Sequence, residues 1–140
     1  MLAASKRTLP LPKPSVIAIV DDDEAVREAL FDLLLVEGLA AYTFDGAAAF
    51  LIDAGIREYA CVVTDVRMPA IDGLELQRRL RASGSLMPVI FVTSCTDEAI
   101  RSSAFENGAI AWFAKPVDDA ALLATLRTVT NRPADDRSWG

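Results

Sequence analysis

The sequence contains no histidine and only two cysteines, Cys61 and Cys95, which do not have the spacing of a metal-binding motif. These absences argue against a histidine–cysteine metal site and a disulfide framework, and they suit a reducing cytoplasm. No apolar run approaches the roughly 18 residues that a transmembrane helix requires. The 14 lysines and arginines are outnumbered by 20 acidic residues and form no basic cluster. We therefore expect a cytoplasmic chain that itself binds neither a membrane nor a nucleic acid.

The length and composition predict one domain with a buried core. The chain has 140 residues, of which 52% are apolar and 24% charged. Prolines interrupt the N-terminal segment, so it makes a poor signal peptide, and we expect residues 1–14 to form a flexible leader. The polar segment 132–140 is expected to be a flexible tail or the start of a linker. Ordered structure is thus predicted for residues 15–131.

Short apolar runs alternate with helical patterns along that segment. The runs typical of strands cover residues 16–20, 40–44, 59–64, 88–93 and 109–114. Three of them are nearly continuous in apolar residues, which is typical of parallel strands covered on both faces. Apolar residues at the spacing of one helix face occur in segments 26–34, 76–80, 97–107 and 122–129. This alternation predicts an α/β fold with a doubly wound parallel sheet and right-handed crossovers.

Polar side chains occur where the predicted strands end, which is where ligands bind in such sheets. Asp21 and Asp22 follow the first run, Asp65 follows the third, Thr93 ends the fourth, and Lys115 follows the fifth. Most of them have simpler explanations when taken alone. An aspartate or a Thr-Ser pair before a helix is often its N-cap, and a lysine is often a solvated charge. Asp65 is harder to explain in this way, because the Arg-Met-Pro sequence behind it keeps it from opening a helix.

Taken together, these residues predict a specific chemistry. Two unit charges about 4 Å apart repel by roughly 4 kcal/mol at the dielectric of a protein surface, so converging Asp21, Asp22 and Asp65 require a cation. Oxygen ligands without histidine or thiolate favour Mg²⁺, which also keeps coordination positions for phosphate oxygens. Lys115 and Thr93 supply the ammonium charge and the hydroxyl donor that a transferred phosphoryl group needs. The set therefore predicts a pocket for phosphoryl chemistry with a carboxylate available as nucleophile.

Residues 15–131 resemble the receiver domain of bacterial two-component response regulators. The matching segments are VIAIVDDDEAVR, VVTDVRMPAIDGLEL, VIFVTS and AWFAKPV, which occur in the family's order and separation. The segments DVRMP and GAIAWFAKP are most similar to the branch of regulators with helix-turn-helix output domains. The resemblance implies a flavodoxin-like sheet of five strands in the order 2-1-3-4-5, with five helices.

The resemblance also implies a role for each residue of the set. Asp65 is implied as the phosphoryl acceptor. The implied Mg²⁺ ligands are Asp21, Asp22, Asp65 and the main-chain carbonyl of Arg67. Because that last ligand is a main-chain atom, an arginine side chain there need not disturb the metal.

Three further residues have roles implied by the family. Thr93 and Lys115 are expected to contact the phosphoryl group, and the peptide bond between Lys115 and Pro116 is often cis. Trp112 stands where the family usually has a tyrosine or phenylalanine that acts as an aromatic switch. When Thr93 is drawn toward the phosphoryl group, Trp112 is expected to turn into the vacated space, although it can equally be a core residue.

The implied partner is a sensor histidine kinase or a phosphotransfer protein that donates the phosphoryl group. Phosphorylation is expected to change the face formed by segment 97–107, strand 109–114 and the final helix, which would then bind a partner or form a homodimer. The 140 residues include no helix-turn-helix output domain. A single-domain regulator and the N-terminal part of a longer one are both open.

Two other functions account for part of the set. A Mg²⁺-dependent phosphohydrolase would also form an aspartyl-phosphate, but such enzymes usually have an acid/base aspartate two residues after the nucleophile, where this chain has Arg67. A binding module with a vestigial pocket would not need the complete set of side chains.

Arg67 and Cys95 bear on the lifetime of the phosphorylated state. They stand two residues after Asp65 and Thr93, where side chains in the family overlook the path of the hydrolytic water. We expect neither to position water well, so the acyl phosphate should persist longer than it would beside a carboxamide or a carboxylate.

Overall fold

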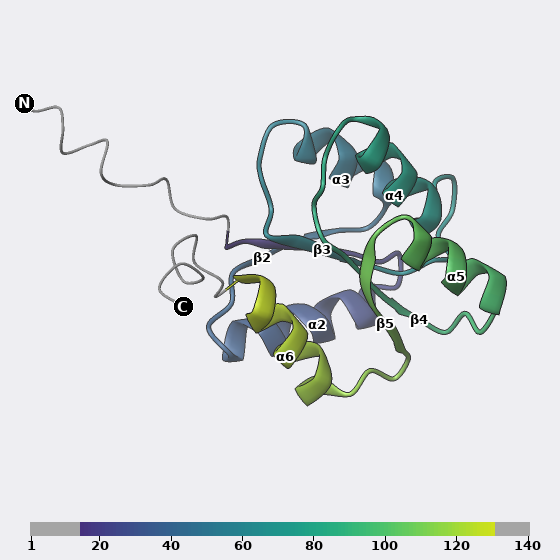
Figure 1. Cartoon of the computed structure of the whole chain (residues 1–140). Helices are drawn as coiled ribbons and strands as arrows, with labels where there is room; N and C mark the ends of the chain where they lie inside the picture. The colour runs from purple at the N-terminus through teal and green to yellow at the C-terminus, as the bar shows by residue number, and fades with distance from the viewer. Residues whose placement is uncertain (1–14, 131–140) are drawn as a thin grey trace, which may run out of the picture.

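The computed structural model describes residues 15–130, in which five strands alternate with five helices (Figure 1). The leader predicted for residues 1–14 and the tail predicted for 132–140 lie outside the described residues. The strands are β1 (Ile17–Val20), β2 (Ala41–Phe44), β3 (Cys61–Thr64), β4 (Val89–Thr93) and β5 (Ala109–Ala114). The helices are α2 (Glu24–Val36), α3 (Ala47–Ala54), α4 (Gly73–Ala82), α5 (Glu98–Glu106) and α6 (Asp119–Thr130).

The strands form one parallel sheet in the order β2-β1-β3-β4-β5, which confirms the predicted topology. Helices α3, α4 and α5 cover one face of this sheet, and α2 and α6 cover the other (Figure 1). Because all strands run in the same direction, their carboxyl ends meet at one edge of the sheet. The polar residues that follow the strands are collected at that edge.

The core has two layers, one on each face of the sheet. Every residue of β1, β3 and β4 is buried, so successive side chains of these strands enter opposite layers. In the first layer Phe91 packs with Phe50 of α3 and Leu76 of α4. In the second, Ile90 packs in one cluster with Leu34 of α2. This explains why these runs are continuously apolar in the sequence rather than alternating.

The edge strand β5 carries an irregularity that places Trp112. Val89 pairs with Ala109 but Ile90 pairs with Ala111, so β5 has one extra residue, Ile110, at this point. Ile110 is left 44% exposed. The shifted register sets Trp112 beside Phe91, which lies in the layer under α3, α4 and α5.

The predicted strands agree with the observed ones to within two residues, and the helix predicted for 97–107 is confirmed as α5. Asp97 caps its start, and Gly108 follows its end with a φ of 94°. No residues had been assigned to a helix after the second strand, where α3 lies. Its apolar residues are nearly continuous, and only Ala47 and Phe50 are buried, so the sequence offers little periodicity. Among residues 15–130, no helix has both the length and the apolar content needed to cross a membrane.

The start of α4 touches the loop that follows β3. A Cβ atom on Gly73 would lie 2.1 Å from the main-chain oxygen of Asp65 and 3.0 Å from Cε1 of Phe91. The Gly73 amide also donates a 2.7 Å hydrogen bond to the carbonyl oxygen of Val66. A glycine is therefore required here for close approach, and this contact fixes the main chain that carries Asp65.

We predict that Gly73→Ala lowers the free energy of unfolding by about 2–3 kcal/mol, because backbone atoms must move to admit the methyl group. The measurement is urea denaturation followed by circular dichroism. Gly55→Ala is the matched control: Gly55 has a right-handed φ of −74°, and its nearest neighbour to a new Cβ is at 3.4 Å. The control should change stability by less than about 1 kcal/mol. Equal stability of both variants would contradict the close approach.

Candidate functional site

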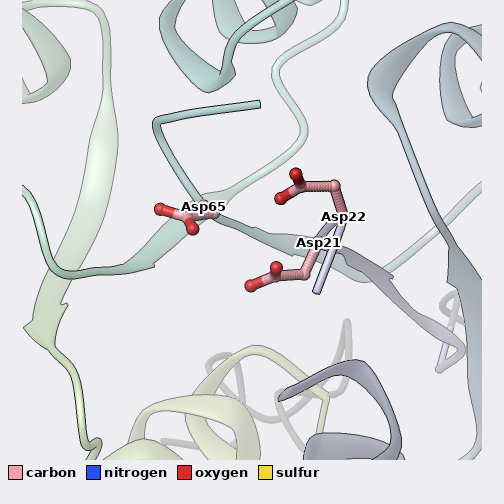
Figure 2. Close-up of side chains that lie close together, drawn as sticks. All are labelled: Asp21, Asp22 and Asp65. Atoms are coloured by element: carbon pink, nitrogen blue, oxygen red, sulfur yellow. The ribbon is translucent and has the colours of Figure 1, made fainter. Parts of the chain in front are cut away.

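Side chains from the carboxyl ends of three strands converge at one edge of the sheet. Asp21 and Asp22 follow β1, Asp65 follows β3, and Lys115 follows β5. One carboxylate oxygen from each aspartate lies within 4.8 Å of the other two. Figure 2 shows the three side chains extending to the same side of the strand ends. The structure thus brings together the three carboxylates that the sequence predicted to converge.

Lys115 links two of these carboxylates. Its Nζ atom lies 3.0 Å from Oδ2 of Asp21 and 2.9 Å from Oδ2 of Asp65. The side chain of Lys115 is 18% exposed, against 2% for Asp21 and 11% for Asp65. Such an ion pair is stable only when the charges remain hydrogen-bonded, since desolvation is costly. Lys115 is therefore not the solvated surface charge that was one explanation for it.

Burial and hydrogen bonding change the pKa values of Asp21 and Lys115. Burial raises the pKa of Asp21, and this outweighs the lowering by the hydrogen bonds from the Asp23 amide and from Lys115. Burial acts to lower the pKa of Lys115, but its hydrogen bonds to Asp65 and Asp21 and their charges together outweigh burial and raise it. The ammonium charge is thus present at neutral pH and is available to an anionic ligand.

The main chain orients both buried carboxylates. The Val66 amide donates to Oδ1 of Asp65 at 2.6 Å, and the Asp23 amide donates to Oδ1 of Asp21 at 2.9 Å. Arg27 of α2 donates from Nη1 to the main-chain oxygen of Asp21 at 2.7 Å. The two amide contacts fix the directions in which the carboxylates point, and Arg27 holds the main chain of Asp21, so the site is preorganised.

The capping explanation for the first aspartates applies to Asp23 rather than to Asp21 or Asp22. Oδ1 of Asp23 accepts hydrogen bonds from the amides of Ala25 at 2.9 Å and Val26 at 3.2 Å, as an N-cap of α2 does. Asp22 is exposed at the solvent side of the cluster. Three carboxylates and one ammonium leave a formal charge of −2, and all the donors are oxygen atoms. This arrangement can hold a hard divalent cation.

Thr93 does not cap the following helix either, since that role belongs to Asp97. Thr93 is buried at the end of β4, and its Oγ1 accepts a 3.1 Å hydrogen bond from the Cys95 amide. Trp112 lies outside the carboxylate cluster and packs on Phe91, with ring centroids 5.5 Å apart at an interplanar angle of 40°. The indole is half-buried in the core layer under α3, α4 and α5. Trp112 pairs with Phe91, which lies two residues before Thr93 on the neighbouring strand.

Arg67 and Cys95 are in contact. Nη2 of Arg67 lies 3.7 Å from Sγ of Cys95, and the arginine is exposed. The side chains expected to lie beside the path of the hydrolytic water therefore contact each other, one from the loop after β3 and one from the loop after β4. The peptide bond between Lys115 and Pro116 is cis, as the resemblance implied.

Sequence reasoning missed two residues that support the site, Gly73 and Arg27. Gly73 appears in the sequence only within the segment VVTDVRMPAIDGLEL, with no role assigned, although a glycine at the start of a helix can mark a close approach of backbone atoms. Arg27 lies one turn into α2, and its side chain reaches back to the main chain after β1. No sequence motif predicts this contact. Both residues act through backbone atoms of the aspartates, so no pattern of charges in the sequence reveals them.

Comparison with known proteins gives a single family. The family model described as response regulator receiver domain matches residues 17–127. The transcriptional regulatory protein FixJ of Azorhizobium caulinodans is 44% identical over 126 residues, covering 89% of this chain and 59% of the relative. The response regulator protein TmoT of Ectopseudomonas mendocina is 44% identical over 114 residues, covering 81% of this chain and 52% of the relative. This chain thus spans a little over half the length of these relatives.

Solved structures agree with the sequence matches. The crystal structure of full-length FixJ from B. japonicum superposes with a TM-score of 0.78 at 35% identity, covering 87% of this chain and 60% of that one. Relatives named as transcriptional regulatory proteins accord with the predicted similarity to regulators that carry output domains. The family match, the strand order and the segments around the clustered aspartates all identify the same domain. This chain belongs to the response regulator receiver domain family.

Proposed function

We propose that this receiver domain accepts a phosphoryl group on Asp65 from a partner histidine kinase or phosphotransfer protein, and that it switches a binding face in response. One observation carries the proposal. Lys115 binds Asp65 and Asp21 while Asp22 lies within 4.8 Å of both, so a nucleophile, a cation and the ligands for a metal are present together. The domain acts as a signalling switch that catalyses only its own phosphorylation and dephosphorylation.

In the proposed step, a carboxylate oxygen of Asp65 attacks the phosphorus of a phosphohistidine. The new O–P bond forms as the N–P bond breaks, and the electron pair stays on the imidazole nitrogen. The imidazole leaves uncharged because its other nitrogen keeps a proton. Lys115, already 2.9 Å from Oδ2 of Asp65, meets the negative phosphoryl oxygens. The Thr93 hydroxyl accepts from the Cys95 amide, so its own proton remains free to donate to them.

We propose Mg²⁺ as the metal of this site, held by Asp21, Asp22, Asp65 and the main-chain carbonyl of Arg67. The all-oxygen donor set and the formal charge of −2 support this choice. When bound, Mg²⁺ supplies positive charge that offsets the negative charge of the phosphoryl oxygens.

An apolar groove beside the site supports a helical protein as the phosphoryl donor. The groove runs along α2 up to Lys115, and its apolar lining includes Val26, Leu30, Leu33, Pro116 and Val117. A partner helix seated there would bring its phosphohistidine to the edge of the sheet that carries Asp65.

The face formed by α5, β5 and α6 is the proposed output surface, through which a second copy of the chain would bind. It exposes Phe105 and Ile110, and the guanidinium of Arg101 lies 5.7 Å from the Phe105 ring. Trp112, packed on Phe91, is the proposed link between Thr93 and this face. Exposed apolar side chains beside a cation are typical of a reversible protein interface.

We place the receiver domain at residues 15–131, and the family match over 17–127 supports these bounds. The names of the relatives suggest control of transcription, so we propose that the switch regulates a transcriptional output. A cytoplasmic location is part of this proposal, because it is where a kinase partner of this type would meet the chain. The phosphohydrolase alternative is disfavoured, since the position two residues after Asp65 carries the cationic Arg67.

The first prediction concerns the acceptor. Incubation with acetyl phosphate and Mg²⁺ should add one phosphoryl group to the wild-type protein, as seen by intact-protein mass spectrometry. Asp65→Asn should show no adduct, because the amide is not a nucleophile for phosphorus. Asp45→Asn is the matched control, since Asp45 follows β2 at the same edge but lies outside the cluster. An adduct on Asp65→Asn, or its loss from Asp45→Asn, would refute Asp65 as acceptor.

The second prediction concerns the metal. Mg²⁺ at ten times its dissociation constant should raise the free energy of unfolding of the wild type by about 1.4 kcal/mol. Asp22→Ala should lose this increment, yet without Mg²⁺ it should be as stable as the wild type or slightly more so, because carboxylate repulsion is relieved. The measurement is urea denaturation with EDTA and with MgCl₂, with Asp45→Ala as control. A large loss of stability in EDTA would mean that Asp22 is a structural residue.

A further inference from the structure

The C-terminal end of α5 is held by two side chains of α4. Nε2 of Gln77 donates hydrogen bonds to the carbonyl oxygens of Ala104 at 2.9 Å and Asn107 at 3.2 Å. Nε of Arg81 donates to the same Asn107 oxygen at 2.9 Å. The last carbonyls of a helix have no partner within the helix. Gln77 and Arg81 therefore form a C-terminal cap that comes from a neighbouring helix.

Arg81 extends this anchor to two strands. Its Nη1 atom donates to the carbonyl oxygens of Ser85 at 3.2 Å and Met87 at 3.0 Å, just before β4. Its Nη2 atom lies 3.5 Å from the carbonyl oxygen of Gly108, just before β5. A Cβ atom on Gly108 would lie 3.1 Å from that nitrogen. One guanidinium thus ties the end of α4, the entrances to both strands and the end of α5.

Gln77 places an amide in the core between α4 and α5. It is completely buried, and its Oε1 atom has no hydrogen-bond partner within residues 15–130. An unpaired buried acceptor of this kind is destabilising. The amide is kept in the core at this cost, and its Nε2 atom is what holds α5. This points to a role in positioning rather than in packing.

The opposite end of α5 has a different kind of support. Asp97 accepts hydrogen bonds from the amides of Ala99 at 2.8 Å and Ile100 at 3.2 Å, so this cap lies within the helix itself. Residues 94–97 connect it directly to Thr93 at the site. The far end of the helix is therefore tied by side chains of α4, whereas its near end follows Thr93 in the chain.

We propose that Gln77 and Arg81 are positioning residues of the switch, which hold the C-terminal end of α5 and the entrance to β5 fixed. Displacement of Thr93 then turns α5 about its C-terminal end instead of sliding the whole helix. This inference rests on the proposed phosphorylation of Asp65. It limits the change to the half of the output face nearest the site, where the segment 94–101 lies, while the exposed Phe105 and Ile110 stay in place beside it.

The test is hydrogen–deuterium exchange of the full chain, with Mg²⁺ alone and with Mg²⁺ plus beryllofluoride as the phosphoryl mimic. In the wild type, beryllofluoride should change exchange in residues 94–101 several-fold and leave residues 104–110 unchanged. In Arg81→Met the response to beryllofluoride should spread to 104–110. Arg79→Met is the matched control: Arg79 lies on the same helix but binds Glu75, so its response should equal that of the wild type.

Arg81→Lys provides a second variant that keeps the charge but lacks the planar fork of donors, and its response should also spread. The comparison is made between the two ligand states of each variant, so a uniform loss of stability does not mimic the effect. Equal changes in both segments of the wild type would overturn the inference, as would a confined response in both Arg81 variants. No response anywhere in the wild type would refute the proposed function, and this inference with it.

Discussion

The ammonium group of Lys115 is the interaction on which the site depends. It lies about 3 Å from a carboxylate oxygen of both Asp21 and Asp65, two groups that are nearly buried and carry the same charge. Without it, two carboxylates would be desolvated side by side, which proteins avoid because the penalty reaches several kcal/mol. Its single charge leaves one negative charge on the pair of Asp21 and Asp65, and Asp22 adds a second. The remaining negative charge supports the proposed binding of a divalent cation, which would in turn attract the proposed phosphoryl group.

The two ends of the parallel strands carry different kinds of contact. At the carboxyl ends of the strands, Lys115 forms ion pairs with Asp21 and Asp65. At the opposite ends Arg81 binds main-chain carbonyls, which no change of ligand at the site alters directly. Helix α5 and strands β4 and β5 connect the two ends. In the proposed function, phosphorylation of Asp65 would therefore change the shape of one face while Arg81 holds the opposite ends of the strands in place.

Much of this account could be predicted from the sequence, because the relevant patterns are local. Strands buried on both faces appear as unbroken apolar runs. The aspartates and Lys115 come directly after strands, and Thr93 ends β4. Helix α3 was not assigned, since its short apolar run has almost no periodicity. Gly73, Gln77 and Arg81 could not be predicted either. Their roles depend on which distant backbone atoms come close, and that is decided only when the helices pack on the sheet.

The stability of Lys115→Met tests the central claim most directly. Removal of the ammonium should lower the free energy of unfolding by about 3 kcal/mol in EDTA, because the buried carboxylates lose their counter-charge. Excess Mg²⁺ should restore much of that loss, since the metal can neutralise the same carboxylates. Asp65→Asn in the Lys115→Met background should also recover stability by removing one of the repelling charges. Unchanged stability of Lys115→Met in EDTA would contradict the account, because the ammonium would then not be what holds the carboxylates together.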